Sequence, residues 1–195
     1  MVIDRSFPES PLPFITSDNY AGAFEATSYL IRKGHTHIAC IQGIPDSHPN
    51  KQRVKGYRQA LAKAKIPYRA EFVTGSHFSK ENGYIHAKEI FSHNQPPTAI
   101  LALSNLISLG ILEAAREKNI QIPKDISLIS FDEQPYSAYL GTPMSTIDQQ
   151  KHEIGKLAVQ HLVEMIENNT DKRDVKIYIP TRLIKRNSVK LLQCE

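Results

Sequence analysis

An α/β fold built on parallel sheets is the fold class that this sequence predicts, and three observations support it. Short apolar runs alternate with amphipathic helical stretches along the chain, which is typical of βαβ units. The run at 99–103 is apolar throughout, as expected for a strand that is covered on both faces. The chain has 195 residues, of which 41% are hydrophobic, so it is long enough to bury a substantial core.

In the first half of the chain, helix and strand signals follow one another in regular order. Ser17, Asp18 and Asn19 each suit the cap of a first helix, which Gly34 would end. Ser79 suits the cap of a later helix. The expected elements are a helix over 20–33, a strand over 37–41, a loop over 44–52 that leads into a second helix, a strand at 72–73 and a third helix from 80.

The second half repeats this alternation and closes on two short strands. Ser104 and Asn105 suit a helix cap. Apolar residues from Ile154 to Ile166 recur at spacings of three and four, which predicts an amphipathic helix. The expected elements are a strand over 99–103, a helix to about 118, a strand over 127–131, a short run over 144–147, a helix over 151–168, and strands over 175–179 and 182–186.

The composition excludes several classes of protein. No apolar run approaches the ~18–20 residues that span a bilayer, and the first ten residues lack the apolar segment of a secretory signal. We therefore expect a cytoplasmic protein with no membrane partner. Cys40 and Cys194 form neither a disulfide framework nor a metal-binding spacing. The net charge is +4, and a solvated strand edge explains the basic cluster at 182–190 better than an anion or nucleic-acid site does.

The sequence predicts no metal site, no cofactor and no catalytic motif. The eight histidines are scattered, and no set of them has the close ligand spacing of a zinc site. No dinucleotide-binding glycine motif, phosphate-binding loop or nucleophile elbow is present. The glycines are better explained as helix ends, turns and points of close packing.

Asp132 is the leading candidate for a ligand contact. It follows the apolar run at 127–131, and in open α/β sheets ligands bind just beyond the carboxyl ends of the strands. Gln134, Tyr136 and Tyr139 follow it, so the region suits a ligand that carries hydroxyl groups. On the residues alone, Asp132 is equally consistent with a residue that caps a turn.

Nine stretches, taken in order, resemble the lactose-repressor (LacI/GalR) family of bacterial transcription regulators. They are VIDR at 2–5, SDNYAG at 17–22, LIRKGH at 30–35, IACIQG at 38–43, RVKGY at 53–57, PTAI at 97–100, IPKD at 122–125, ISFD at 129–132 and PTRLIKR at 180–186. The family implies a periplasmic-binding-protein-like α/β fold, with two doubly wound parallel-sheet lobes and an effector in the cleft between them. On this basis we expect an incomplete N-terminal lobe at 1–36 and 149–173, and a C-terminal effector-binding lobe at 37–148 and 174–195.

The resemblance also implies which residues contact the effector. Asp132 matches the acidic cleft residue that accepts hydrogen bonds from ligand hydroxyls, and Arg53 matches an arginine that donates from the opposite wall. Phe78 matches an aromatic ring against the ligand, although a core position explains it as well. Ser47 lies in a loop of variable contacts. Ser104 stands where the family commonly has Asn-Asp, a departure that keeps a polar contact and leaves the effector's identity open.

As a function, the resemblance implies the effector-sensing core of a sugar-responsive regulator or repressor. Family members act as homodimers, and ligand changes the angle between the lobes and with it the placement of two DNA-binding headpieces. The chain begins inside what resembles the end of a strand, so we expect that it lacks the headpiece and the first part of the N-terminal lobe. DNA binding is then expected only through that missing headpiece.

Two other functions are consistent with the residues. An exported sugar-binding protein would have the same architecture, but no signal sequence is seen. A small enzyme acting on a phosphorylated sugar would need a phosphate-binding loop or an acid/base pair, for which Asp132 with His48 or His77 is the only candidate. The sequence favours the regulator, and therefore a protein that is not an enzyme.

Overall fold

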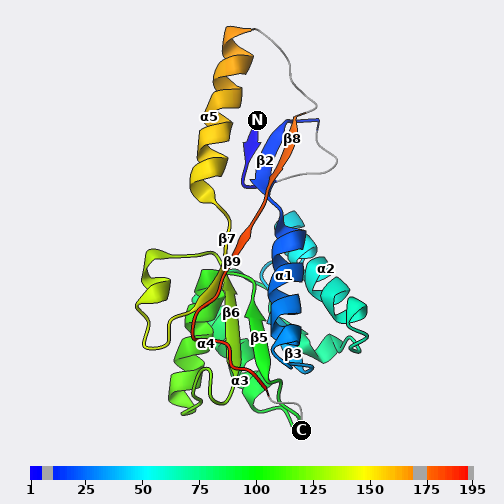
Figure 1. Ribbon diagram of the computed structural model, residues 1–195, viewed down its shortest axis with the longest axis vertical. Helices are drawn as coiled ribbons and strands as arrows, with labels where there is room; N and C mark the ends of the chain where they lie inside the picture. Colours follow the sequence, from blue (N-terminus) through cyan, green and yellow to red (C-terminus); the bar gives the residue numbers. More distant parts are fainter. Residues whose placement is uncertain (6–10, 169–174, 193–195) are drawn as a thin grey trace.

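The chain forms two sheets of different size, one above the other (Figure 1). This description rests on a computed structural model and covers residues 1–5, 11–168 and 175–192. We call the unit with the six-stranded sheet the large lobe and the unit with the three-stranded sheet the small lobe. The predicted α/β fold with two lobes built on largely parallel sheets is present.

The sheet of the large lobe has the strand order β4-β3-β5-β6-β7-β9. All neighbouring strands are parallel except β9, which pairs antiparallel with β7. The strands are β3 (Ile38–Ile41), β4 (Val73–Thr74), β5 (Ala99–Ala102), β6 (Ser127–Phe131), β7 (Ser145–Asp148) and β9 (Arg182–Ile184).

Two helix pairs cover the two faces of this sheet. One pair is α1 (Asn19–Arg32) with α2 (His48–Lys63), and the other is α3 (Lys80–Phe91) with α4 (Asn105–Glu117). Along β3, Ile38 and Cys40 belong to the core under the first pair, and Ala39 and Ile41 to the core under the second. This alternation of side chains explains why β3 is apolar on every residue.

Glycine allows the helices within each pair to approach closely. A Cβ atom on Gly56 of α2 would lie 2.3 Å from the carbonyl oxygen of Tyr20 in α1. A Cβ atom on Gly83 of α3 would lie 2.1 Å from the carbonyl oxygen of Ile107 in α4. Any larger residue at either position would separate the pair.

The small lobe has the strand order β1-β2-β8 and one helix, α5 (Lys151–Glu167). Its strands are β1 (Val2–Ile3), β2 (Phe14–Ser17) and β8 (Lys176–Ile179). All three are parallel. Its buried core is small and consists of Ile15, Ile154, Ala158 and Ile179.

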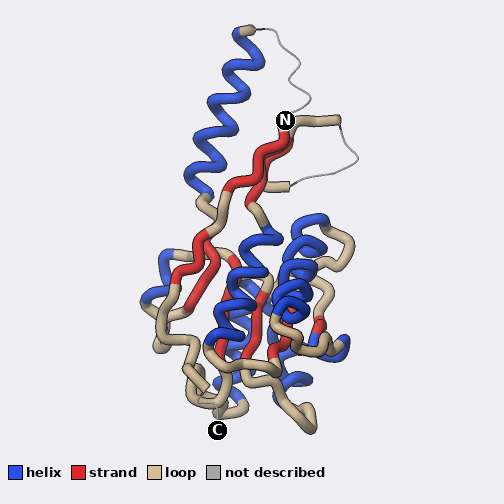
Figure 2. Tube along the Cα trace, turned by 45° about the vertical axis from the view of Figure 1, so that its right-hand side comes forward, coloured by secondary structure: helices blue, strands red, loops and turns tan. Residues whose placement is uncertain are grey.

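Three segments connect the lobes side by side, at a narrow waist that is visible in Figure 2. They run from β2 to α1, from β7 to α5 and from β8 to β9. The backbone N–H of Asp18 donates to the carbonyl of Ile179 at 2.8 Å, and the side-chain amide of Gln150 donates to the carbonyl of Pro180 at 2.5 Å. Gln150 itself has a left-handed backbone, with a φ of 52°. The segments therefore support one another where the chain changes lobe.

The structure differs from the expected lobe boundaries at two places. The boundary expected at 36 lies after α1, yet α1 packs against α2 in the large lobe, so the chain changes lobe near 18. The boundary expected at 173 and 174 falls outside the described residues. Because β8 pairs with β2, the last change of lobe comes only after β8.

Most expected elements are present, with three differences. β2 lies before the helix expected over 20–33, where no strand was expected. α2 begins at His48, within the expected loop over 44–52, with Pro49 in its first turn, where proline is tolerated. The strand expected at 72–73 is a short 3₁₀ turn, Ala70–Phe72, followed by β4. Another short 3₁₀ turn, Pro135–Ala138, follows β6.

Candidate functional site

A cavity of about 230 Å³ lies between the lobes, at the carboxyl ends of the large-lobe strands. The large lobe contributes Arg53, Phe78, Ser104 and Asp132 to its lining. Asp4 and Arg5, which follow β1, contribute from the small lobe. Four of the five predicted contact residues are therefore brought together in one cavity, which we call the cleft.

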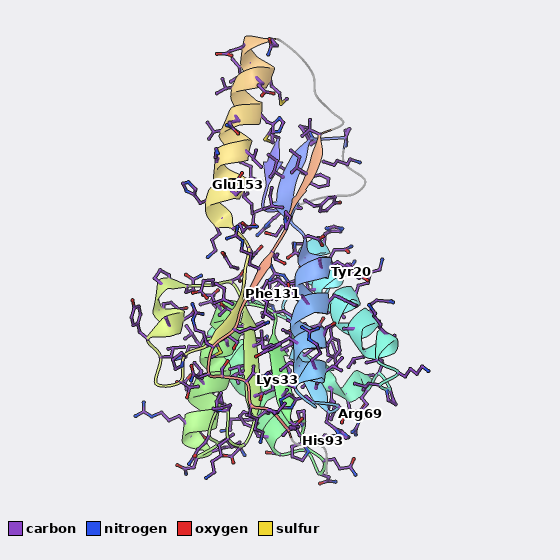
Figure 3. The ribbon with its side chains drawn as sticks, in the orientation of Figure 1. Tyr20, Lys33, Arg69, His93, Phe131 and Glu153 are labelled. Atoms are coloured by element: carbon purple, nitrogen blue, oxygen red, sulfur yellow. The ribbon has the colours of Figure 1, made fainter. Side chains whose placement is uncertain are left out.

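Arg53 is held rigidly in the wall of the cleft and is 6% exposed. Its Nε donates to Oδ1 of Asn19 at 2.7 Å, and its Nη1 donates to the carbonyl of Leu103 at 2.6 Å. The guanidinium carbon lies 4.1 Å from the ring centroid of Phe131, which Figure 3 labels just below the waist. Its Nη2 donates no hydrogen bond to the described residues, so this group is available to a ligand.

The charge of Arg53 is only partly compensated. Burial lowers the pKa of Arg53, while the nearby carboxylates of Asp132 and Asp4 raise it. A guanidinium stays protonated in proteins despite such a shift. The cleft therefore contains a fixed cation with a carboxylate from each lobe nearby.

Asp132 has a backbone conformation that residues other than glycine seldom adopt. Its φ is 71°, in the left-handed region, where aspartate is better tolerated than most residues. The backbone N–H of Asp132 donates to the carbonyl of Ile147 in β7 at 3.0 Å, which holds the turn. Asp4, on the small-lobe side, also has a left-handed backbone, with a φ of 64°. Such conformations concentrate at ligand sites.

Gln149 is a cleft residue that the sequence did not single out. Its side-chain Nε2 donates to Oδ1 of Asp132. Its Oε1 is buried and has no hydrogen-bond partner among the described residues. Buried acceptors without a partner are uncommon, and a ligand hydroxyl could donate to this one. Gln149 belongs to the segment that leaves β7 for the small lobe, so one side chain lies both in the cleft and in the waist.

Ser104 and Phe78 line the cleft, and each also makes a contact within the large lobe. The Oγ of Ser104 accepts from the backbone N–H of Ile107 at 3.3 Å and so caps α4. Its hydroxyl proton remains free to donate to a ligand. Phe78 packs against the core on the α3 and α4 side, and its ring fills the space beside Gly43, where a Cβ would lie 2.1 Å from it.

Ser47 is the one predicted contact that the structure does not bring to the cleft. It precedes α2, and its Oγ donates to the carbonyl of Ile44 at 2.9 Å. The neighbouring Pro49 lines the cleft instead. Asn105 and Leu106, at the start of α4, also line it without having been predicted. The sequence indicated only that a helix cap lies at 104–105.

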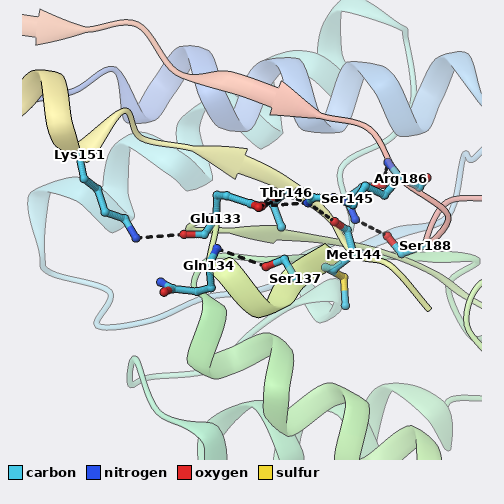
Figure 4. Close-up of polar contacts among 9 residues, drawn as sticks. All are labelled: Glu133, Gln134, Ser137, Met144, Ser145, Thr146, Lys151, Arg186 and Ser188. Carbon is cyan, nitrogen blue, oxygen red and sulfur yellow. Dashed lines mark hydrogen bonds and ion pairs between the residues drawn. The ribbon is translucent and has the colours of Figure 1, made fainter. Parts of the chain in front are cut away.

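A network of polar contacts anchors the residue after Asp132 (Figure 4). Arg186 binds the carboxylate of Glu133 with both terminal nitrogens, at 2.9 and 2.6 Å, and the hydroxyl of Thr146 donates to the same carboxylate. Lys151, the first residue of α5, donates to the backbone carbonyl of Glu133 at 3.0 Å. The network joins β7, the C-terminal segment and α5, and so connects the turn at Asp132 to the small lobe.

The electrostatics of Glu133 agree with this geometry. Burial raises the pKa of the Glu133 carboxyl, but hydrogen bonds from Arg186 and Thr146 outweigh it, and the pKa is lowered overall. The charged carboxylate of Glu133 is thus the form that Arg186 and Thr146 stabilise. Two-point binding by arginine fixes orientation as well as charge.

Within the described ranges, no group of three or more His, Cys, Asp or Glu residues is arranged to hold a metal ion. The same residues include no helix that is long and apolar enough to cross a membrane. The functional groups assembled in the cleft are therefore hydrogen-bond donors and acceptors and an aromatic ring. Such groups can bind a polar ligand of modest size.

The comparisons with known proteins agree on one family. The family model described as a periplasmic binding protein-like domain matches residues 27–189. The ribose operon repressor of Haemophilus influenzae is 32% identical over 187 residues, which is 96% of this chain and 56% of that protein. The chain thus spans a little over half the length of this relative.

Solved structures agree in fold. A structure described as a putative transcriptional regulator LacI from Bacillus cereus subsp. cytotoxis is 34% identical, with a TM-score of 0.89, over 98% of this chain and 68% of that one. A LacI family transcriptional regulator from Enterococcus faecium, with bound ribose, is 25% identical, with a TM-score of 0.90, over 98% of this chain and 71% of that one.

Proposed function

The chain belongs to the periplasmic binding protein-like domain family, in the form found in LacI-type regulators, and from that premise we propose that it is the effector-sensing core of a bacterial transcriptional regulator. Its effector is a small sugar or sugar derivative that binds in the cleft without being converted. The regulator works as a homodimer in the cytoplasm, where its DNA is, and contacts operator DNA through a separate headpiece.

The convergence of Arg53, Asp132 and Gln149 is the observation that carries this proposal. Together they offer a guanidinium donor, a carboxylate acceptor and a buried amide oxygen without a partner. A sugar presents several hydroxyls, each of which donates one hydrogen bond and accepts others. Phe78 adds an apolar surface for the ring carbons. The match between these groups and a polyol is chemical and does not depend on the name of any relative.

The size of the cleft favours a small ligand. Its volume of about 230 Å³ lies below the range of about 300–1,000 Å³ typical of drug-sized ligands. A monosaccharide is therefore the favoured class. In agreement with this, the similar regulator from Enterococcus faecium contains ribose.

Ligand binding would act on the angle between the lobes. Asp4 and Arg5 line the cleft from the small lobe, whereas Arg53 and Asp132 line it from the large lobe, so a ligand held by both sides favours the closed arrangement. The free energy available for closure is the difference in ligand affinity between the closed and open states. Gln149 transmits the event directly, because it contacts Asp132 and belongs to one of the three connecting segments.

The test is a thermal-shift screen of monosaccharides, followed by the variant Asp132→Asn. Asparagine tolerates a left-handed backbone, so the substitution removes the charge with little change in conformation. A ligand at ~100 times its Kd should add about 2.7 kcal/mol of stability to the native protein. Loss of a carboxylate that the bound ligand encloses and hydrogen-bonds should cost about 2–5 kcal/mol of binding free energy in the variant.

Glu25→Gln is the matched control, because Glu25 is an exposed carboxylate on α1 outside the cleft. It should leave the ligand-induced shift unchanged. A sugar that stabilises Asp132→Asn as strongly as the native chain would refute the assignment of the cleft. A sugar that the native chain converts into a product would refute a purely sensing role.

A further inference from the structure

A second cavity lies on the other side of α2 from the cleft, and the proposed function does not use it. Its volume is about 410 Å³, within the range typical of small-molecule sites. We call it the α2 basic pocket. Its polar lining consists of Gln42, Asn50, Lys51, Lys55, Arg58 and Tyr68.

The geometry of α2 separates this pocket from the cleft. At about 100° per residue, Lys51, Lys55 and Arg58 fall within about 60° of one another around the helix axis, and Arg53 falls on the opposite side. The sequence of α2, HPNKQRVKGYRQALAK, contains five lysines and arginines and no acidic residue. Like charges at this spacing oppose helix formation, so the pattern has no stabilising role within the helix.

The charge of the pocket is poorly compensated within the described part of the chain. Lys51 pairs with Asp46 at 3.1 Å, and both side chains are more than half exposed. Among the residues that the structure describes, Lys55 has no carboxylate partner, and its Nζ lies 5.9 Å from the ring centroid of Tyr20. Arg58 donates to the hydroxyl of Tyr68 at 2.7 Å, which is a neutral partner. One carboxylate thus accompanies three cations.

The start of α2 adds to the positive potential. Ser47 makes no capping hydrogen bond with its side chain, and its hydroxyl donates to the carbonyl of Ile44. The first turn of α2 therefore keeps N–H groups that no side chain of Ser47 satisfies, at the positive end of the helix dipole. Asn50, in that turn, lines the pocket and orients Gln42 by donating to its Oε1 at 3.0 Å. The Nε2 of Gln42 donates no hydrogen bond to the described residues.

We propose that the α2 basic pocket binds the phosphoryl group of a small phosphorylated metabolite. Lysine and arginine are the residues that hold phosphate, and the arginine fork can bind two of its oxygens. The cavity is larger than a phosphate ion needs. Val54 and Val73 provide an apolar wall, and Tyr68 an aromatic one, for the body that carries the phosphoryl group. The pocket is distinct from the cleft, so both can be occupied at once.

The experiment is calorimetric titration of the whole chain with ribose 5-phosphate, repeated in the Asp132→Asn variant, in which binding through the α2 basic pocket should keep the same dependence on Lys55 and Arg58. Lys55→Gln and Arg58→Gln should each weaken binding about tenfold, the value of one charge-assisted hydrogen bond. Asp46→Asn should strengthen binding, because it frees Lys51. Lys63→Gln is the control, since Lys63 is an exposed cation in the last turn of the same helix, outside the pocket.

Three results would overturn the proposal. Ribose 5-phosphate could bind no more tightly than ribose, which would show that the phosphoryl group is not read. Lys63→Gln could weaken binding as much as Lys55→Gln, which would indicate diffuse attraction by net charge. Duplex DNA could bind with the same dependence on Lys55 and Arg58, which would identify a nucleic-acid surface. None of these results bears on sugar binding in the cleft, which the Asp132 variants test separately.

Discussion

The large lobe and the small lobe share one architecture, parallel strands with helices packed on them, but they bury very different amounts of apolar surface. Both faces of the six-stranded sheet are covered, and two extensive apolar clusters result. The three-stranded sheet has one helix, and its one buried apolar cluster among the described residues has four members. A sheet thus gains most of its stability from the layers on its faces, and the small lobe has few of them among the described residues.

Helices α4 and α5 show the same contrast in two single elements. Both have apolar residues at helical spacing. α4 lies against the large sheet and buries Ile107 and Ile111 completely. α5 is longer but buries only Ile154 and Ala158, while Leu162 and Ile166 are 48% and 72% exposed. An amphipathic pattern therefore predicts a helix, whereas burial depends on what the rest of the fold places against it.

The largest difference between the lobes should appear when one core residue in each is shortened. Leu101→Ala, at a fully buried position of β5, should lower the free energy of unfolding by about 3–5 kcal/mol. Ile154→Ala should lower it by less than about 1 kcal/mol in the global transition, because a lobe with a small core opens locally before the whole chain unfolds. Urea denaturation measures both values.

Hydrogen exchange supplies the second readout for this pair. Amides of α5 and β2 should exchange faster than those of β5 and β6 in the unmodified chain. Equal losses for the two variants, or slower exchange in the small lobe, would show that both lobes unfold as one cooperative unit.

A smaller effect is a pH dependence of stability that arises in the large lobe. His35, between α1 and β3, is fully buried, and burial is the main reason that its pKa is lowered to about 4. Below about pH 6.5 the unfolded chain binds a proton there that the folded chain does not. The stability that neutral His35 contributes is therefore present above about pH 6.5 and is lost as pH falls towards 4, by about 3 kcal/mol in all.

Urea midpoints between pH 7 and pH 4 would measure this slope. The variant His35→Gln should lose the slope whatever its own stability, whereas His37→Gln, at an exposed position nearby, should keep it. Since His35 binds Thr98 and the carbonyl of Lys190, the loss belongs to the large lobe. A slope that survives in His35→Gln would assign acid lability to other groups.

The smallest expected effect concerns the exposed face of α5. Leu162→Gln should lower the free energy of unfolding by about 1 kcal/mol, because only about half of the side chain is buried. Ile111→Gln, at the corresponding apolar stripe of α4, should prevent stable folding by burying an unpaired amide. If Leu162→Gln costs as much as a core substitution, another surface covers α5 in solution.

The sequence predicted local features well and tertiary ones less well. β6 was expected over the residues that form it, and Ser79 and Ser104 cap their helices as predicted. β2 was missed because four residues after a run of prolines carry too little pattern to signal a strand. Its identity comes from pairing with β8, which lies far away in the sequence.

The same reasoning applies to the cleft. Asp132 was accessible from its place after a strand, and Arg53 from the family resemblance. Gln149 gave no signal, because a glutamine in a polar connecting segment looks like any other solvated residue. Only the fold puts its amide against Asp132. Ser47 is the opposite case. It lies close to cleft residues in the sequence, but its side chain donates to the carbonyl of Ile44 and does not line the cleft.

Because the backbone of Asp132 is left-handed, selection for stability and selection for ligand binding should favour different residues at this position. Glycine would occupy that conformation without steric cost, and removal of such strain commonly stabilises a protein. Glycine would also remove the large-lobe carboxylate from the cleft. Variants selected only for folding would therefore drift away from aspartate at 132, whereas variants selected for response to ligand would retain it. In a library of variants randomised at position 132, the residue that selection retains would show whether ligand binding or stability limits the protein.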